Sequence, residues 1–354
     1  MKKIRVGFVG AGRMGQCAHL KNYVTLPDCE VVAIAELRTN LAHKVAMRYG
    51  ISRVYSNHKE MLEKENLDAI VASQPFTIHG QLIPELLSAH IPVFIEKPLA
   101  SSVETGQKIV EAISKSGTWV MVGYHKRSDP ATMFAKSEIE KLKASGEIGR
   151  VSYIRILMPP GDWIASGFSD LIQTEEEYPH LKSDPQPSEM DKATFDNYIK
   201  FVNYYIHQVN LMRYLLGESY RVSYADPSGI LLIGQSVSGI TCCIEMAPYQ
   251  TTIDWQESVM VAFQRGWVKV ELPAPLTCNR PGSVEIFKDP GKGIQPTKLI
   301  PQLPWIHAMR QQAINFVRAV RGEIPPTCTA EEALEDLIIA KQYLDLLTKN
   351  KKGE

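Results

Sequence analysis

A glycine-rich turn near the N-terminus constrains the fold of this chain more than any other feature. The apolar run Ile4 to Val9 leads directly into Gly10-Ala11-Gly12-Arg13-Met14-Gly15, and residues 16–25 can form a helix. The first glycine permits a tight turn, the second lets the backbone approach a pyrophosphate, and the third lets helix and strand pack closely. The segment therefore predicts a strand, a dinucleotide-binding turn and a helix whose N-terminus faces the phosphates.

A carboxylate at the end of the next predicted strand extends this pattern. The strand Glu30 to Ala35 ends at Glu36, at the spacing of about 20 residues where an acid binds the adenosine ribose hydroxyls. Glu36 favours NAD as the cofactor. Arg38 follows two residues later and offers the alternative of a contact with the 2′-phosphate of NADP. The competing structural interpretation of Glu36 is a solvated carboxylate at a strand end.

Strands and helices continue to alternate as far as Lys97. Helices are predicted near 40–49, 59–63 and up to 89, between strands at 54–55, 69–72 and 92–95. This order of βαβ units predicts an α/β fold with a doubly wound parallel sheet. Ligands bind at the strand ends of such sheets, and two of those ends carry polar segments: Ser73-Gln74-Pro75 with His79 beyond it, and Glu96-Lys97-Pro98.

Length and composition limit the classes of protein to consider. The 354 residues suffice for two domains, and 39 basic side chains balance 39 acidic ones, which argues against a nucleic-acid or anionic-lipid partner. Six cysteines show neither a C-x-x-C pair nor metal-ligand spacing, so no metal and a reducing compartment are expected. We find neither a signal peptide nor a membrane span, and expect a cytoplasmic protein with a small-molecule partner.

The second half of the chain has a different pattern. Extended segments are predicted at 151–157, 230–233, 238–245, 256–262 and 267–271, and several alternate apolar and polar residues as a sheet with one exposed face does. The segment 158–191 is rich in proline, serine and acids and is too long for an ordinary connection. It is a candidate substrate lid or oligomer contact, or a passive insertion, and its Trp163 is a candidate for stacking on a sugar ring.

One long helix is predicted from Thr194 to Gly217. Along it, Asn203, His207 and Asn210 lie at positions i, i+4 and i+7, on a single line beside the apolar stripe. A solvated helix face usually carries lysine and glutamate, whereas this line has amides and an imidazole. The line therefore indicates a polar cleft.

Four segments resemble the Gfo/Idh/MocA family, which includes glucose-fructose oxidoreductase and the inositol dehydrogenases. They are the glycine turn, residues 74–79, Glu96-Lys97-Pro98, and the run from Gly123 to Pro130. The resemblance implies a Rossmann domain at 1–124 and an α+β domain at 125–354 with a large open, mostly antiparallel sheet, the insertion at about 158–191, and C-terminal helices that pack back on the first domain. It also implies a homodimer or homotetramer formed through the open sheet.

The same resemblance assigns roles to individual residues. Lys97 would lie between nicotinamide and substrate, and Asn203 to His207 looks like the family's D-x-x-x-H segment, with His207 as the base. Asparagine in place of that aspartate should make His207 a weaker base and leave Lys97 a larger share of the proton transfer. Lys126 and Arg127 are candidate substrate or cofactor contacts, with a charged surface turn as the alternative.

These features predict an NAD(P)-dependent oxidoreductase. It would transfer a hydride between nicotinamide and a secondary alcohol or ketone of a sugar, a polyol such as an inositol, or a nucleotide sugar. One alternative is a glycosidase- or lyase-like enzyme in which the cofactor is reduced and reoxidised within a turnover. Another is a non-catalytic nucleotide-binding regulator, suggested by Asn203 and opposed by the presence of both Lys97 and His207.

Overall fold

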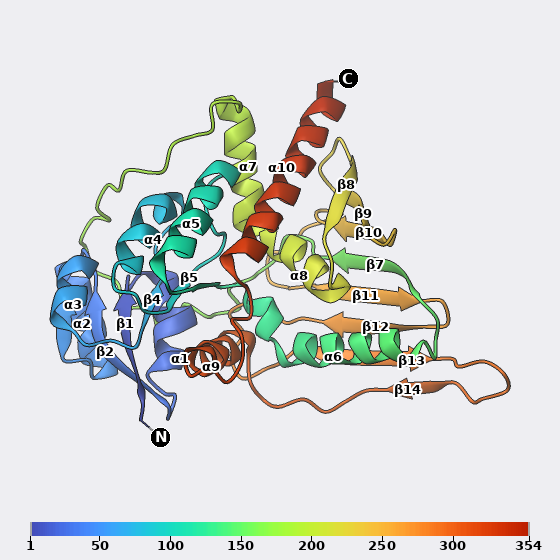
Figure 1. The fold of residues 1–354 in the computed structure, drawn as a ribbon, viewed down its shortest axis with the longest axis horizontal. Coiled ribbons are helices and arrows are strands. Elements are labelled where there is room, and N and C mark those ends of the chain that lie inside the picture. Colours follow the sequence, from blue (N-terminus) through green and yellow to red (C-terminus); the bar gives the residue numbers. More distant parts are fainter. Residues whose placement is uncertain (1, 353–354) are drawn as a thin grey trace. The chain divides into compact units, whose positions relative to one another are not determined.

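The computed structural model describes residues 2–352, and the chain in it forms two compact units (Figure 1). The first unit combines the residues up to Tyr124 with Ser166–Phe195 and Met309–Leu337. The second combines His125–Ala165, Asp196–Ala308 and the residues from Ile338 onward. The two units are therefore not consecutive halves of the sequence, because the first takes in two later segments.

The first unit is built on a parallel sheet of six strands in the order β3-β2-β1-β4-β5-β6. The strands are β1 (Ile4–Val9), β2 (Cys29–Ala35), β3 (Arg53–Tyr55), β4 (Ala69–Ala72), β5 (Val93–Ile95) and β6 (Val120–Val122). The order reverses between β1 and β4, and in doubly wound sheets ligands bind at such a reversal, outside the carboxyl ends of the strands. The predicted Rossmann sheet is confirmed.

Helices connect these strands. They are α2 (Thr39–Tyr49), α3 (His58–Lys64), α4 (His79–Leu87) and α5 (Val103–Ser116). The helix after the glycine turn has a π-helical part, η1 (Gly15–Leu20), and continues as α1 (Lys21–Tyr23). π-Helical turns are rare and occur frequently at functional sites. The core beneath holds Phe8 and Phe94, and Phe316 of α9 (Ala308–Val320) packs edge-on against Phe94 with ring centroids 5.7 Å apart.

The second unit is built on a sheet of eight strands in the order β14-β13-β12-β11-β7-β10-β9-β8. All neighbours are antiparallel except β7 and β10, which confirms the predicted open sheet. Helix α6 (Pro130–Ser145) contacts β12 and β13. The strands are β7 (Val151–Leu157), β8 (Tyr220–Ala225), β9 (Leu231–Ser236), β10 (Thr241–Glu245), β11 (Ser258–Phe263), β12 (Gly266–Glu271), β13 (Ser283–Lys288) and β14 (Thr297–Leu299).

The prediction of one long helix from Thr194 to Gly217 is wrong. The structure has two helices, α7 (Lys192–Tyr204) and α8 (Ile206–Leu216), which meet at Tyr205. The hydroxyl of Tyr205 donates to the carbonyl of Met246 at 2.5 Å, and its ring lies 6.0 Å from that of Phe201. The hydrogen bond to Met246 is a tertiary contact that holds Tyr205 where the helix breaks, and the apolar periodicity on either side of the break gives no sign of it.

The last helix is α10 (Ala330–Lys352). Its start forms a capping box: the Thr329 amide donates to Glu332 at 3.0 Å, and the Glu332 amide donates to the Thr329 hydroxyl at 3.3 Å. Among residues 2–352, no helix combines the length and the apolar character that a bilayer crossing requires.

Candidate functional site

The glycine turn of the first unit has the geometry that a dinucleotide needs. Gly10 has φ +94°, a backbone conformation that favours glycine, and a Cβ on Gly15 would lie 2.5 Å from the Gly10 carbonyl oxygen. A Cβ on Gly12 would instead meet nothing nearer than the Arg38 guanidinium at 3.7 Å. Gly10 and Gly15 thus hold the turn together, while Gly12 faces space into which a pyrophosphate can approach.

Glu36 lies beside this turn. Its side chain is 4% exposed, and its Oε2 accepts a hydrogen bond from the Ala11 amide at 2.8 Å. Arg38 Nε donates to Glu36 Oε1 at 3.0 Å. The alternative of a solvated strand-end carboxylate is therefore wrong. The structure brings together the glycine turn, Glu36 and Arg38 as the sequence predicts for a ribose site.

The segment after β4 forms the other side of the turn. The Ser73 amide donates to the Val9 carbonyl at 2.9 Å, and Gln74 Nε2 would be 2.7 Å from a Cβ on Gly10. The buried hydroxyl of Ser73 has no hydrogen-bond partner within residues 2–352, so a bound cofactor can satisfy it. Pro75 precedes the short helix η2 (Phe76–Ile78). His79 is fully buried, and burial lowers the pKa of its ring, whose Nδ1 lies 3.0 Å from the Leu99 carbonyl oxygen.

Lys97 follows β5 in the same unit and is anchored by its neighbour. The Lys97 amide donates to Glu96 Oε2 at 3.1 Å. The other carboxylate oxygen of Glu96, Oε1, lies 2.5 Å from Nε2 of His19. This histidine lies on η1 and is 1% exposed. Burial raises the pKa of Glu96, but the hydrogen bond and charge of His19 together with Lys97 outweigh it, so the net shift is downward. Sequence reasoning missed His19, whose only signal was a histidine in the helix after the glycine turn.

Replacing His19 with alanine is expected to lower the free energy of unfolding by about 3 kcal/mol near pH 7, because Glu96 becomes a buried carboxylate without this partner. A carboxylate with a lowered pKa stabilises the fold above its unfolded pKa and loses that effect as the pH falls through the folded value. The deficit should therefore shrink in acid. Urea denaturation at about pH 7 and about pH 4 measures both values.

The matched control is His58→Ala, since His58 pairs with the half-exposed Glu85 at 2.8 Å. We expect it to cost less than about 1 kcal/mol, as surface pairs do. Equal losses in the two variants would contradict a structural role for the His19–Glu96 contact.

The second unit holds a separate polar cluster around η3 (His125–Ser128). All residues of this turn are buried, so the alternative of a charged surface turn for Lys126 and Arg127 is wrong. Lys126 forms an ion pair with Glu257, whose side chain is 0% exposed. Gln208 donates to the same carboxylate at 2.8 Å. Glu257 was not predicted from the sequence, where it was one acid among several at the start of a predicted strand.

Helix α8 brings further groups to this cluster. Arg127 Nε donates to Asn210 Oδ1 at 2.7 Å, and the His207 ring lies edge-on to the His125 ring with centroids 4.6 Å apart. Asn203 is exposed and lies on α7, before the break. The predicted line of Asn203, His207 and Asn210 thus spans the break at Tyr205, with the first residue on α7 and the other two on α8.

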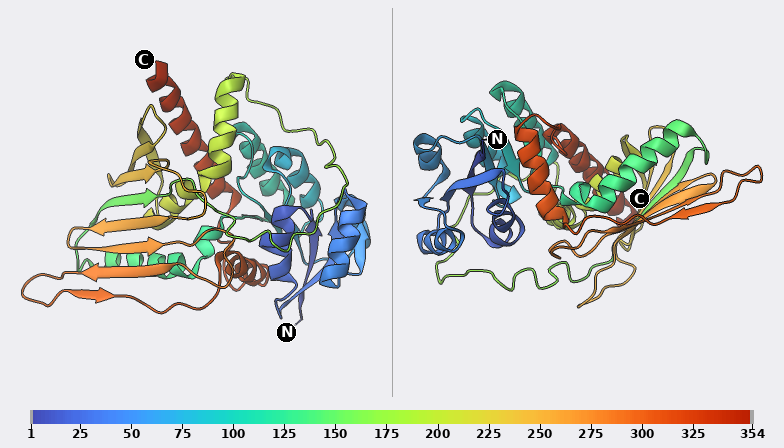
Figure 2. Two further views of the ribbon diagram at one scale, coloured as in Figure 1. Left: turned by 180° about the vertical axis from the view of Figure 1, so that it is seen from behind. Right: turned by 90° about the horizontal axis from the view of Figure 1, so that it is seen from below.

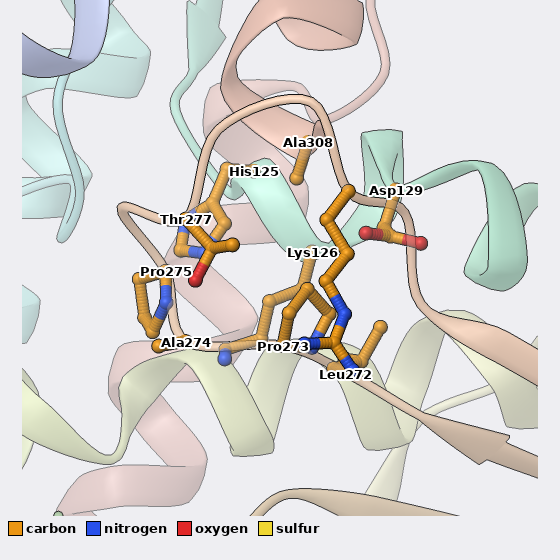
Figure 3. Close-up of a pocket in the computed structure, with 10 residues that line it drawn as sticks. His125, Lys126, Asp129, Leu272, Pro273, Ala274, Pro275, Thr277 and Ala308 are labelled. Carbon is orange, nitrogen blue, oxygen red and sulfur yellow. The ribbon is translucent and has the colours of Figure 1, made fainter. Parts of the chain in front are cut away.

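A small pocket opens beside η3 (Figure 3). Residues of η3 and the loop after β12 form much of its wall; it is lined by His125, Lys126, Asp129, Leu272, Pro273, Ala274, Pro275, Thr277, Arg280 and Ala308. The backbone of Trp163 accepts a hydrogen bond from the Leu276 amide at 3.3 Å, which ties the half-buried Trp163 to the same loop. The pocket thus combines imidazole, ammonium and guanidinium donors with a proline-rich wall.

Asp129 is the acid of this pocket. It accepts hydrogen bonds from the amides of Ala131 at 2.8 Å and Gly282 at 3.0 Å. Burial nevertheless raises its pKa to about 6, and Glu257 acts in the same direction. The side chain is therefore half-ionised only near pH 6.

We expect Asp129→Asn to remove a pH dependence of stability. A carboxyl whose pKa is raised in the folded state binds its proton more tightly there, so wild-type stability should fall as the pH rises from about 4 through about 6. Melting temperatures across this interval would measure the difference between the two proteins. If that difference stays constant with pH, Asp129 titrates normally. Asp226→Asn serves as the control. Asp226 is a turn residue whose pKa is lowered in the fold, so its contribution to stability should rise with pH, opposite to that of Asp129.

Comparison with known proteins shows what this chain is similar to. Residues 4–124 match the model of the oxidoreductase family with an NAD-binding Rossmann fold, GFO_IDH_MocA. Myo-inositol 2-dehydrogenase of Thermotoga maritima is 24% identical over 66% of this chain and 60% of its own length. Inositol 2-dehydrogenase of Rhizobium meliloti is 25% identical over 92% of this chain and 91% of its own length. The chain thus spans less than two thirds of the first of these relatives.

A solved structure extends the likeness to both units. The myo-inositol 2-dehydrogenase from Lactobacillus plantarum superposes with a TM-score of 0.68 at 20% identity, covering 99% of this chain and 98% of that one. At this identity the likeness shows the fold. Taken with the glycine turn and Glu36, these matches show that residues 4–124 form an NAD-binding Rossmann domain similar to that of the GFO_IDH_MocA oxidoreductases, and that the whole chain shares the fold of this solved structure.

Proposed function

We propose that this protein is an NAD-dependent dehydrogenase or reductase that acts on a secondary alcohol or ketone of a cyclic polyol or sugar. The observation that carries the proposal is Lys97: it follows strand β5 and its anchor Glu96 in the unit whose glycine turn and Glu36 fit a dinucleotide. A lysine at a strand end of a nucleotide-binding sheet is positioned for chemistry at the cofactor.

The reaction needs a hydride carrier and a group that exchanges the hydroxyl proton. Bound NAD supplies the hydride chemistry. Lys97 would orient the reacting oxygen and take its proton, with its amide fixed on Glu96 and Glu96 fixed on His19. His207 would serve as the second proton-transfer group, because an imidazole changes protonation near neutral pH.

The substrate class follows from the donors in the second unit. His125, Lys126 and Arg127 bring imidazole, ammonium and guanidinium groups to one buried turn, and Asn210 adds an amide. Such a cluster suits a ligand that offers many hydroxyl oxygens. The names of the curated relatives, inositol dehydrogenases, support a cyclic polyol ahead of a nucleotide sugar.

We also propose a cytoplasmic homodimer or homotetramer. The six cysteines, all within the described residues, form no disulfides, and all but Cys278 are buried, as suits a reducing compartment. The strands of the second sheet alternate buried and half-buried residues, for example in β11 and β7, so one sheet face is available to another subunit. Light scattering gives the mass in solution directly.

Absorbance at 340 nm tests the activity. The protein is mixed with NAD or NADP and a panel of inositols, sugars and nucleotide sugars. Net formation of reduced cofactor with one panel member is the expected result. If a cofactor binds and no panel member causes net reduction, product analysis by mass spectrometry separates an internal redox cycle from a non-catalytic regulator.

A further inference from the structure

The segment Ser166–Phe195, here called the strap, crosses the first unit as an extended trace (Figure 2). Ile172 exchanges two hydrogen bonds with the side chain of Gln16, at 3.0 and 3.1 Å. Asp184 accepts a hydrogen bond from the Gly80 amide at 2.8 Å. Gln16 and Gly80 lie in the first turns of helices that follow parallel strands, so the strap runs along the edge of the sheet where ligands bind.

Glu176 of the strap caps helix α2. Its Oε1 accepts from the Asn40 amide and its Oε2 from the Leu41 amide, both at 2.9 Å. Thr174 adds a hydroxyl donor at 3.1 Å. Amides in the first turn of a helix have no intrahelical acceptor and attract anions. Although burial opposes it, these hydrogen bonds and the charge of Arg38 lower the pKa of Glu176, so it is a carboxylate at neutral pH.

Arg38, at the start of the same helix, is held from two directions. Its guanidinium donates to Glu36 at 3.0 and 3.2 Å and lies 5.0 Å from the centre of the Tyr178 ring. Tyr178, also on the strap, donates from its hydroxyl to Gln74 Oε1 at 3.3 Å. The cation is therefore neutralised by Glu36 and kept in place by an aromatic ring.

These contacts bear on the choice between NAD and NADP, which differ by a phosphate on the adenosine 2′-hydroxyl with a charge near −2. If the ribose hydroxyls bind Glu36, the 2′-phosphate needs hydrogen bonds from the Arg38 guanidinium and from amides at the start of α2 that are free to donate. We propose that Glu176 makes the site specific for NAD by occupying those amides with a carboxylate and excluding the 2′-phosphate. The inference rests on the proposed ribose contact of Glu36.

Calorimetric titration of NAD⁺ and NADP⁺ into the wild type and Glu176→Gln tests this without depending on turnover. The wild type should bind NAD⁺ more tightly. In the variant, the affinity for NADP⁺ should rise about tenfold, because one negative charge facing the phosphate is lost, while the affinity for NAD⁺ changes by less than about twofold. Melting temperatures without nucleotide confirm that the variant is folded.

Two control variants separate charge from strap geometry. Glu177→Gln removes an equal charge from the exposed neighbouring residue and should leave the ratio of the two affinities unchanged. Glu176→Asp keeps the carboxylate and should still disfavour NADP⁺. The inference would be overturned if Glu176→Gln gained affinity equally for both nucleotides or left the ratio of the two affinities unchanged, or if the wild type bound both equally well. These outcomes would leave the proposed cofactor site intact. If the wild type binds neither nucleotide, the proposed cofactor site fails, and this inference with it.

Discussion

Replacing Lys97 with methionine is expected to lower kcat by at least about 10²-fold, the usual contribution of a positioned proton-transfer group. Methionine retains much of the length of the side chain and removes its charge and its exchangeable protons. The affinity for NAD should change by less than about threefold, because the ribose and phosphate contacts of the glycine turn and Glu36 remain. Steady-state rates at 340 nm and cofactor titration measure the two quantities.

A second variant distinguishes proton transfer from simple attraction. Lys97→Arg retains a cation but replaces it with a guanidinium that stays protonated to about pH 12 or above. If Lys97 carries the proton, the arginine variant should be nearly as slow as the methionine variant. Recovery of wild-type rates in Lys97→Arg would show that only the charge matters. Lys44→Met, at an exposed lysine of α2 in the same unit, controls for the loss of a surface charge.

The largest effect on stability is expected at Glu257. Replacing it with leucine leaves Lys126, whose side chain is 4% exposed, buried without its partner carboxylate. Breaking such a pair by removing one member costs about 3–5 kcal/mol. Gln208 also loses the acceptor that it contacts at 2.8 Å. Trp255 lies 5.6 Å from the Lys126 ammonium, so its fluorescence reports on this region during urea denaturation.

The double variant Lys126→Met with Glu257→Leu is the decisive comparison. Removing both charges should restore most of the lost stability, because no uncompensated charge stays buried. Glu285→Leu is the surface control on the same sheet: Glu285 pairs with the exposed Lys298 at 2.7 Å and should contribute less than about 1 kcal/mol. If the single and double variants are equally unstable, the loss comes from packing instead of charge.

The residues that sequence reasoning placed correctly are those whose roles depend on adjacent positions. Strand β4 begins and ends at the predicted residues, and Gly10 and Gly15 have the positive φ and the close backbone approach that their spacing predicts. Each of these features follows from a local requirement: a positive φ, a close backbone approach, or an alternation of side chains along a strand. Such requirements are written in contiguous residues.

Contacts between distant parts of the sequence escaped this reasoning. Lys126 and Glu257 are 131 positions apart, His19 and Glu96 are 77 apart, and Asn40 and Glu176 are 136 apart. No local period marks such partners, since any acid in a predicted strand or long connection is an equally good candidate. The long connection itself was recognised, but its path along the nucleotide-binding edge was not.

The sequence by itself determined the nucleotide-binding turn, the alternation that makes the first sheet parallel, and the position of Lys97 after a strand. Only the tertiary structure decided that the helix after the strap breaks at Tyr205 and that Lys126 and Arg127 are buried. It also decided which carboxylates meet Lys126 and the start of α2. The reason is physical: backbone conformation responds to neighbouring residues, whereas burial and charge pairing are fixed when remote segments pack together.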